Sequence, residues 1–273
     1  MKVIDPHYEI KQITNWIKEY FAKNGPAANA VIGISGGKDS TIAAALLVRA
    51  LGKERVIGVM MPQNTQTDID DSRKVCEILG IQSYEIDIGP ACTALYRAID
   101  DGFDSDSISG NNYMVKTNTP ARIRMATLYA IAAMTHGRVC NTSNNSEKYV
   151  GYSTKWGDGV GDFGLFRNYT VRDVLAIGAA MDELPKELVF KPAADGMSGK
   201  TDEDNLGFTY EELDAYILDG EYPSAEKTAK IVARNKGAQH KVMTIPCPGY
   251  PRSAHEDTED WSEAGLEKGV VFF

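Results

Sequence analysis

Residues 30–40 read Ala30-Val31-Ile32-Gly33-Ile34-Ser35-Gly36-Gly37-Lys38-Asp39-Ser40, and the sequence changes character within them. The apolar run Ala30–Ile34 predicts a strand that is buried on both faces. The helix formers from Thr41 to Leu51 predict a helix that ends at Gly52. Between them, the adjacent glycines let the backbone approach a ligand, and the helix start offers unpaired N–H groups to a phosphate. A carboxylate at Asp39 is useful there if Mg²⁺ bridges it to the phosphate.

This loop does not fit the two commonest phosphate-binding patterns. A Walker loop that ends at Gly37-Lys38 needs glycine where Ile32 stands and serine or threonine where Asp39 stands. A dinucleotide fingerprint that starts at Gly33 needs glycine at Ser35. The loop therefore follows neither of these two patterns.

Outward from this loop, short apolar segments alternate with helical ones. The predicted strands are Ala30–Ile34, Arg55–Met61, Ser83–Ile88 and Arg138–Thr142. The predicted helices between them are Thr41–Leu51, Asp68–Leu79, Pro90–Asp100 and Ala121–Thr135, with a polar loop over 101–112. This alternation predicts an α/β fold with a doubly wound parallel sheet flanked by helices, whose ligands bind at the carboxyl ends of the strands.

The two ends of the chain are helical or polar. An opening amphipathic helix should bury Ile10, Ile13, Ile17 and Phe21. Residues 144–166 are rich in Gly, Asn and Asp, which favours a functional loop or lid. Further helices are predicted over 171–181, 209–218 and 224–235. We expect one domain over 1–273, with a tail of unassigned role over 248–273.

Composition restricts the class of protein. The chain has 273 residues, 43% hydrophobic and 25% charged, with a formal charge of −9. That negative charge disfavours a nucleic-acid partner. No apolar run approaches the ~20 residues that span a bilayer, so we expect a cytoplasmic protein without a membrane partner. Four cysteines without metal spacing predict reduced, mostly buried thiols.

The segment Ser35–Ser40 after a first strand resembles the pyrophosphate loop of the ATP pyrophosphatases. That group cleaves ATP between the α and β phosphates, adenylates an oxygen of its substrate and releases pyrophosphate. The loop alone leaves GMP, asparagine, argininosuccinate, NAD and modified tRNA bases open as products. A nucleotide-binding module without catalysis is a further alternative.

Later segments resemble those of the ammonia-dependent NAD synthetases, in order, from about residue 10 to 245. They are Asn118–Met125, Asn141–Glu147, Gly151–Gly159, Lys191–Asp195, Asp202–Gly207 and His240-Lys241. The resemblance implies an adenine nucleotide alpha hydrolase-like fold and a homodimer. It also implies the last step of NAD biosynthesis, in which ATP activates deamido-NAD and ammonia then displaces AMP.

The resemblance also implies roles for matching residues. The ATP site would comprise Gly33, Ile34, Ser35, Gly36, Gly37, Lys38, Asp39, Ser40, Thr142, Arg172 and Ala193. The deamido-NAD site would comprise Arg122, Lys155, Asp162, His240 and Lys241. Mg²⁺ would be held by Asp39 and Glu147, and the catalytic residues would be Asp39, Lys155 and Asp158.

Two positions depart from the family pattern. A lysine that contacts ATP phosphate in relatives is Val171 here, beside Arg172, and a threonine is Ala193. Either Arg172 supplies the missing charge or ATP is held by fewer contacts. A further hypothesis is that Asp158 or Asp162 helps to remove a proton from ammonium.

Overall fold

The computed structural model describes residues 4–64, 69–103, 112–191 and 201–242. The chain divides after Val242, and the unit Met1–Val242 contains all of the described residues. The tail 248–273, Ala193 and Cys247 lie outside them. The expected single domain over 1–273 therefore stays a prediction.

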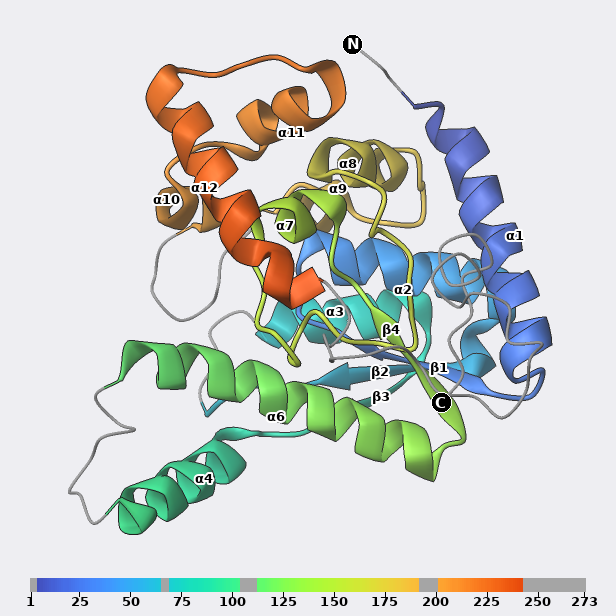
Figure 1. The fold of residues 1–273 in the computed structure, drawn as a ribbon. Helices are drawn as coiled ribbons and strands as arrows, with labels where there is room; N and C mark the ends of the chain where they lie inside the picture. Colours follow the sequence, from blue (N-terminus) through green and yellow to red (C-terminus); the bar gives the residue numbers. More distant parts are fainter. Residues whose placement is uncertain (1–3, 65–68, 104–111, 192–200, 243–273) are drawn as a thin grey trace, which may run out of the picture. The chain divides into compact units, whose positions relative to one another are not determined.

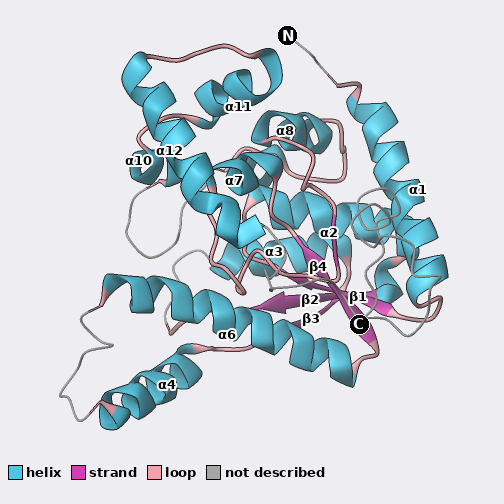
Figure 2. Cartoon of the chain, viewed as in Figure 1, coloured by secondary structure: helices cyan, strands magenta, loops and turns pink. Residues whose placement is uncertain are grey.

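Among the described residues, five parallel strands form one sheet in the order β3-β2-β1-β4-β5, of which β1 to β4 are labelled in Figures 1 and 2. The strands are β1 (Asn29–Gly33), β2 (Val56–Met60), β3 (Gln82–Glu85), β4 (Gly137–Asn141) and β5 (Phe163–Gly164). The predicted fold class is confirmed, and four strands overlap the predicted segments. β5 was not predicted, since a strand of two residues carries no periodicity.

The described helices connect and cover these strands. They are α1 (Pro6–Asn24), α2 (Lys38–Leu51), the 3₁₀ turn η1 (Lys53–Arg55), α3 (Ile69–Leu79), α4 (Gly89–Gly102), α6 (Tyr113–Met134), α7 (Asn145–Val150), α8 (Val171–Ala179), α9 (Lys186–Val189), α10 (Asp202–Leu206), α11 (Tyr210–Asp219) and α12 (Ala225–Val242). None of the helices among the described residues is long and apolar enough to cross a membrane.

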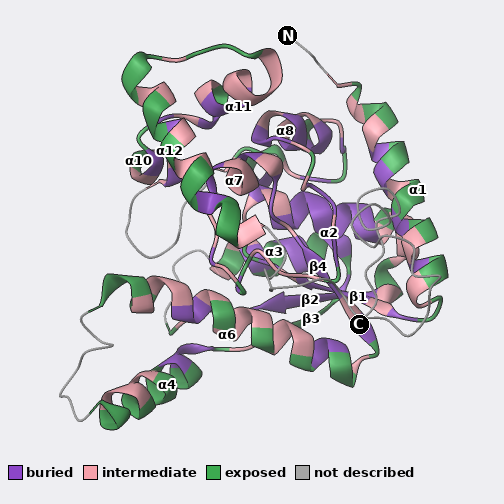
Figure 3. Ribbon diagram, in the orientation of Figure 1, coloured by how far each residue is buried: buried purple, intermediate pink, exposed green. Residues whose placement is uncertain are grey.

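Both faces of the sheet are covered, so the central strand is buried throughout its middle (Figure 3). Ala30 and Ile32 pack into the larger core with residues of α1, α2, α3 and α8. Val31 points the other way, into a second core with residues of α4 and α6. This confirms that the run Ala30–Ile34 is apolar because both of its faces are buried. The predicted inner face of α1 is also confirmed, since Ile10, Ile13, Ile17 and Phe21 are buried.

Two segments differ from the prediction. α6 begins at Tyr113 rather than Ala121, with Asn112 as its N-cap and Pro120 inside the helix. The predicted start was wrong because a proline often marks the first turn of a helix. The segment 144–166 is not a plain loop, since it contains α7 and β5. A capping box of Asn144 and Glu147 starts α7 and explains how so short a helix is fixed in a polar stretch.

Candidate active site

The carboxyl ends of β1 and β4 meet at the middle of the sheet, where the order of connection reverses. β1 pairs with β2 on one side and with β4 on the other. The loops that leave β1 and β4 are therefore neighbours at one edge of the sheet. Ligands of open parallel sheets bind in the crevice at such a switch point.

The loop after β1 has the geometry of a phosphate-binding turn. Gly36 adopts a φ of +73°, and a Cβ there would lie 2.9 Å from Asp71 Cβ and 3.1 Å from Ser72 N. α2 starts at Lys38, and no side chain caps its first turn at Gly37. The first N–H groups of the helix thus stay available to an anion. Hydroxyls within the loop brace it, since Ser40 Oγ donates to Gly37 O at 3.1 Å.

Two carboxylates meet beside this turn. Lys38 Nζ lies 2.9 Å from Asp39 Oδ2, and the Asn144 side-chain amide donates to Asp39 Oδ1 at 3.1 Å. Glu147, in α7, contacts the same asparagine, because Asn144 N donates to Glu147 Oε2 at 3.2 Å. Burial and the nearby charge of Asp39 raise the pKa of Glu147 well above its usual range, and Lys38 offsets only part of this.

This donor set fits a hard divalent cation. Mg²⁺ is commonly bound by one or two carboxylates together with water and substrate phosphates. Among the residues that the structure describes, no cluster of three or more His, Cys, Asp or Glu side chains could hold a metal without such help. A cation between Asp39 and Glu147 would also relieve the repulsion that raises the pKa of Glu147.

Asp202 and Tyr210 were not predicted as site residues, yet they lie beside Lys38. Tyr210 Oη donates to Asp202 Oδ2 at 3.2 Å, and the Lys38 ammonium lies 5.6 Å from the centre of the Tyr210 ring. Both residues are buried. Burial and the charges of Glu147, Asp202 and Asp39 raise the pKa of the Tyr210 hydroxyl, which therefore stays protonated. Asp202 appeared in the sequence only within a matched segment, and no local pattern indicated its burial.

A second group of predicted residues surrounds the loop 151–162. Asn141 Nδ2, at the end of β4, donates to Asp158 O at 2.8 Å, and Thr154 N donates to Asp158 Oδ1 at 2.7 Å. Arg122 Nε, on α6, donates to Lys155 O at 3.2 Å. The structure thus brings Arg122, Lys155 and Asp158 to one loop. Asp158 is an exposed residue, and the protein groups around its carboxyl raise the pKa of that carboxyl, chiefly by desolvation.

Lys241 and His240 lie at the end of α12. Lys241 Nζ donates to Gly151 O at 2.7 Å and to Ser153 O at 2.6 Å, so it fixes the start of the loop 151–162. His240 is exposed, and its Nδ1 lies 2.8 Å from Gly237 O. Lys241 therefore belongs with the residues around the loop 151–162. The polar contact that the structure describes for His240 lies within its own helix, α12.

The remaining predicted residues are placed differently. The Asp162 carboxylate accepts hydrogen bonds from Val139 N at 2.7 Å and from Tyr129 Oη at 3.3 Å. Asp162 directly precedes β5, so its contact with Val139 continues the pairing of β4 with that segment. Arg172 Nη1 pairs with Asp219 Oδ2 at 3.0 Å, while its Nη2 is buried without a hydrogen-bond partner among the described residues. Thr142 is half-buried directly after β4.

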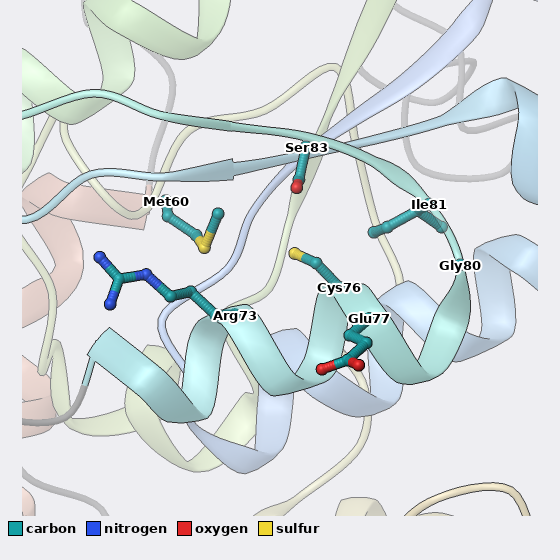
Figure 4. A pocket seen from close by; sticks show the side chains of 7 residues that line it. All are labelled: Met60, Arg73, Cys76, Glu77, Gly80, Ile81 and Ser83. Atoms are coloured by element: carbon teal, nitrogen blue, oxygen red, sulfur yellow. The ribbon is translucent and has the colours of Figure 1, made fainter.

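A cavity between α3 and β3 lies apart from these residues (Figure 4). Met60, Arg73, Cys76, Glu77, Gly80, Ile81 and Ser83 line it. The charge of Arg73 is already balanced, because its guanidinium bonds to Glu85 at 2.7 Å and 2.8 Å and to Asp70 at 2.7 Å. The cavity contains none of the predicted site residues.

The fold and the site define an α/β protein in which a turn suited to phosphate lies at the switch point of a parallel sheet. The family model for NAD synthase matches residues 9–256. The chain therefore belongs to the NAD synthase family. Of the products that the phosphate loop alone left open, this family membership indicates NAD.

Several known proteins are similar to this chain. The NH(3)-dependent NAD(+) synthetase of Thermococcus kodakarensis is 38% identical over 80% of this chain and 82% of its own. That of Thermoplasma acidophilum is 36% identical over 82% and 92%. Among solved structures, the NMN synthetase of Francisella tularensis gives a TM-score of 0.81 at 33% identity, covering 91% of this chain and 100% of its own. The NH3-dependent NAD synthetase of Campylobacter jejuni, in complex with nitrate, gives 0.72 at 25% identity, covering 89% and 99%.

Proposed function

We propose that ATP binds at the carboxyl ends of β1 and β4, and that deamido-NAD binds along the loop 151–162. As a member of the NAD synthase family, the chain is an ATP-using carbon–nitrogen ligase that amidates deamido-NAD with ammonia. The observation that carries the site assignment is the meeting of Asp39 and Glu147 at Asn144, beside the uncapped start of α2.

The reaction has two steps that balance. A carboxylate oxygen of the nicotinate ring forms a bond to the α-phosphorus of ATP, the bond from that phosphorus to the bridging oxygen breaks, and pyrophosphate leaves. Ammonia then forms a C–N bond to the activated carbonyl, the C–O bond to AMP breaks, and the nitrogen gives up a proton. No side-chain nucleophile is required, because holding both substrates in line supplies much of the rate enhancement.

The phosphates would lie on Gly33–Ser40, with the first N–H groups of α2 directed at them. Asp39 and Glu147 would hold Mg²⁺, which, when bound, offsets the negative charge that develops as pyrophosphate leaves. Lys38 and Arg172 supply positive charge from the protein. Thr142 would contact the adenosine part, and the role of Ala193 stays a prediction outside the described residues.

Arg122, Lys155 and Lys241 supply cations for the pyrophosphate and carboxylate of deamido-NAD, for which such groups are suited. They lie around one loop, which supports a common ligand. Asp162 and His240 complete the assignment by family resemblance. The homodimer and the cytoplasmic location also stay proposals, and α6 offers a surface for a second copy.

The assay supplies ATP, Mg²⁺, ammonium and deamido-NAD, and measures NAD, AMP and pyrophosphate. We expect stoichiometric products from the wild type. Asp39→Ala and Glu147→Gln should each lose at least about 10²-fold in kcat. Asp182→Ala, an exposed acid between α8 and α9, is the control and should keep full activity. Near wild-type rates in both site variants would reject the assignment.

A second candidate function is amidation of nicotinate mononucleotide to NMN. It is favoured by the TM-score of 0.81 to the Francisella tularensis NMN synthetase, compared with 0.72 to the Campylobacter jejuni NAD synthetase. The reacting carboxylate is the same in both substrates, which differ in the AMP half. Competition between equal concentrations of the two acids distinguishes the functions, and we expect NAD as the main product.

A further inference from the structure

Asn144 forms hydrogen bonds with both acidic residues, and both polar atoms of its side chain take part. It is fully buried. Its Nδ2 donates to Asp39 Oδ1 at 3.1 Å, and its Oδ1 accepts from Glu147 N at 3.0 Å. Its backbone N–H donates to Glu147 Oε2 at 3.2 Å. One residue therefore contacts both acids through separate atoms.

The two acids need such a mediator because they come from different elements and repel each other. Asp39 lies in the first turn of α2, and Glu147 lies in α7. Lys38 pairs with Asp39 at 2.9 Å and offsets part of the negative charge. The amide of Asn144 adds a donor to the other oxygen of Asp39, while the capping box fixes the direction of the Glu147 side chain.

The helix that carries Glu147 is anchored from its far side. Ser146 Oγ donates to Asp214 Oδ1 at 2.5 Å and accepts from Val171 N at 3.0 Å. Asp214 Oδ2 also accepts from Arg172 N at 2.7 Å. α7 is thus tied to α8 and α11, so Asn144 is held in place by the surrounding fold rather than by its short helix alone.

We propose that Asn144 is a positioning residue, which holds Asp39 and Glu147 in the geometry for one shared Mg²⁺ ion. This inference rests on the proposed function of the two acids as metal ligands. It goes further, because it assigns the asparagine two separable tasks: capping α7, and aligning Asp39 through its amide. Residues behind metal ligands commonly account for about 10–100-fold in metal affinity.

The test separates the two tasks with variants. Asn144→Ser keeps a good N-cap but lacks the amide that reaches Asp39. Asn144→Ala loses both tasks. Thr209→Ala is the matched control, because it removes the same kind of capping box from α11 without touching either acid. Mn²⁺ affinity is measured by electron paramagnetic resonance, with and without α,β-methylene-ATP, and Tm is measured without metal.

We expect Asn144→Ser to keep a wild-type Tm and to bind Mn²⁺ about tenfold more weakly. Thr209→Ala should lose about 3 °C in Tm and keep wild-type affinity for Mn²⁺. Asn144→Ala should show both losses. Wild-type Mn²⁺ affinity in Asn144→Ser overturns the inference, even if Asn144→Ala does not fold.

Two further variants separate this inference from the proposed function. Asp39→Ala and Glu147→Gln should both abolish tight Mn²⁺ binding. If they do so while Asn144→Ser binds normally, only the positioning role fails. If they bind Mn²⁺ as the wild type does, the metal assignment itself fails, and with it the role of Asn144.

Discussion

Asn144 Nδ2 donates to Asp39 Oδ1 at 3.1 Å, although the two residues lie 105 positions apart in the sequence. The contact joins the loop after β1 to the loop after β4. It places the start of α2 and the start of α7 at one point, where the proposed ATP and metal sites meet.

Arg172 is expected to compensate for the lysine that Val171 replaces. Its Nη2 is buried without a described partner, and a buried donor of this kind is costly until a ligand bonds to it. We expect Arg172→Met to raise KM for ATP about tenfold, the loss of one charged hydrogen bond. Asp219→Asn removes the charge that pairs with Arg172 and should leave KM for ATP unchanged. Equal KM values in the two variants would limit Arg172 to a structural role.

Gly36 is expected to be irreplaceable in the phosphate loop. A Cβ there would meet Asp71 Cβ at 2.9 Å in a backbone conformation that side chains rarely adopt. Gly36→Ala should lower the free energy of unfolding by about 2 kcal/mol or more and abolish binding of α,β-methylene-ATP in calorimetry. Gly220→Ala is the control, since its φ is +69° but nothing lies within 4 Å of its Cβ position. It should cost about 1 kcal/mol and bind the nucleotide normally.

Asp158 is expected to be the carboxylate that takes the proton from ammonium. Its pKa is raised, mainly by desolvation, so it is a better base than an ordinary aspartate. Asp158→Asn should lower kcat/KM for ammonium by about 10²-fold and remove the acidic limb of the pH–rate profile. Asp162→Asn should keep that limb, because its carboxylate bonds to Val139 N. Two profiles identical to the wild type would reject both acids.

The ion pair of Arg49 and Glu183 is expected to give a pH-dependent stability. Arg49 bonds to both carboxylate oxygens at 2.6 Å, which lowers the pKa of Glu183 below its usual value. A lowered pKa stabilises the fold above the unfolded value of 4.5, and the contribution is lost as pH falls through the folded value. Because the pair is partly exposed, Glu183→Gln should cost only about 0.5 kcal/mol at pH 7.

The check is urea unfolding of Glu183→Gln at pH 7 and pH 3, with Glu19→Gln as an exposed control on α1. The difference from the wild type should shrink at pH 3 and in 1 M salt. A loss that is equal at both pH values would show that the charge of Glu183 does not matter.

The sequence was sufficient where local pattern and burial coincide. The apolar run of β1 and the face of α1 were predicted because their periodicity reports burial directly. The phosphate loop was predicted because its glycines and Asp39 lie in one short segment. The predicted start of α6 was wrong because Pro120 is accommodated inside the helix.

The three-dimensional contacts of the site could not be predicted in the same way. Asp202 and Tyr210 come close to Lys38 only through tertiary packing, and no sequence pattern predicts this proximity. Arg172 has the charge that the sequence suggested, but its pairing with Asp219 became visible only in the fold. The bridging position of Asn144 likewise depends on β1 lying beside β4.

The pairing of β1 with β4 has a consequence for biosynthesis. At roughly 5 to 20 residues per second, the ribosome needs about 5 to 20 s to add the 105 positions that separate Asp39 from Asn144. During this interval the glycine turn exists without β4, so the proposed ATP site is incomplete. ATP bound at the proposed site would therefore stabilise only chains in which β4 has joined β1, and would favour molecules with a complete central sheet.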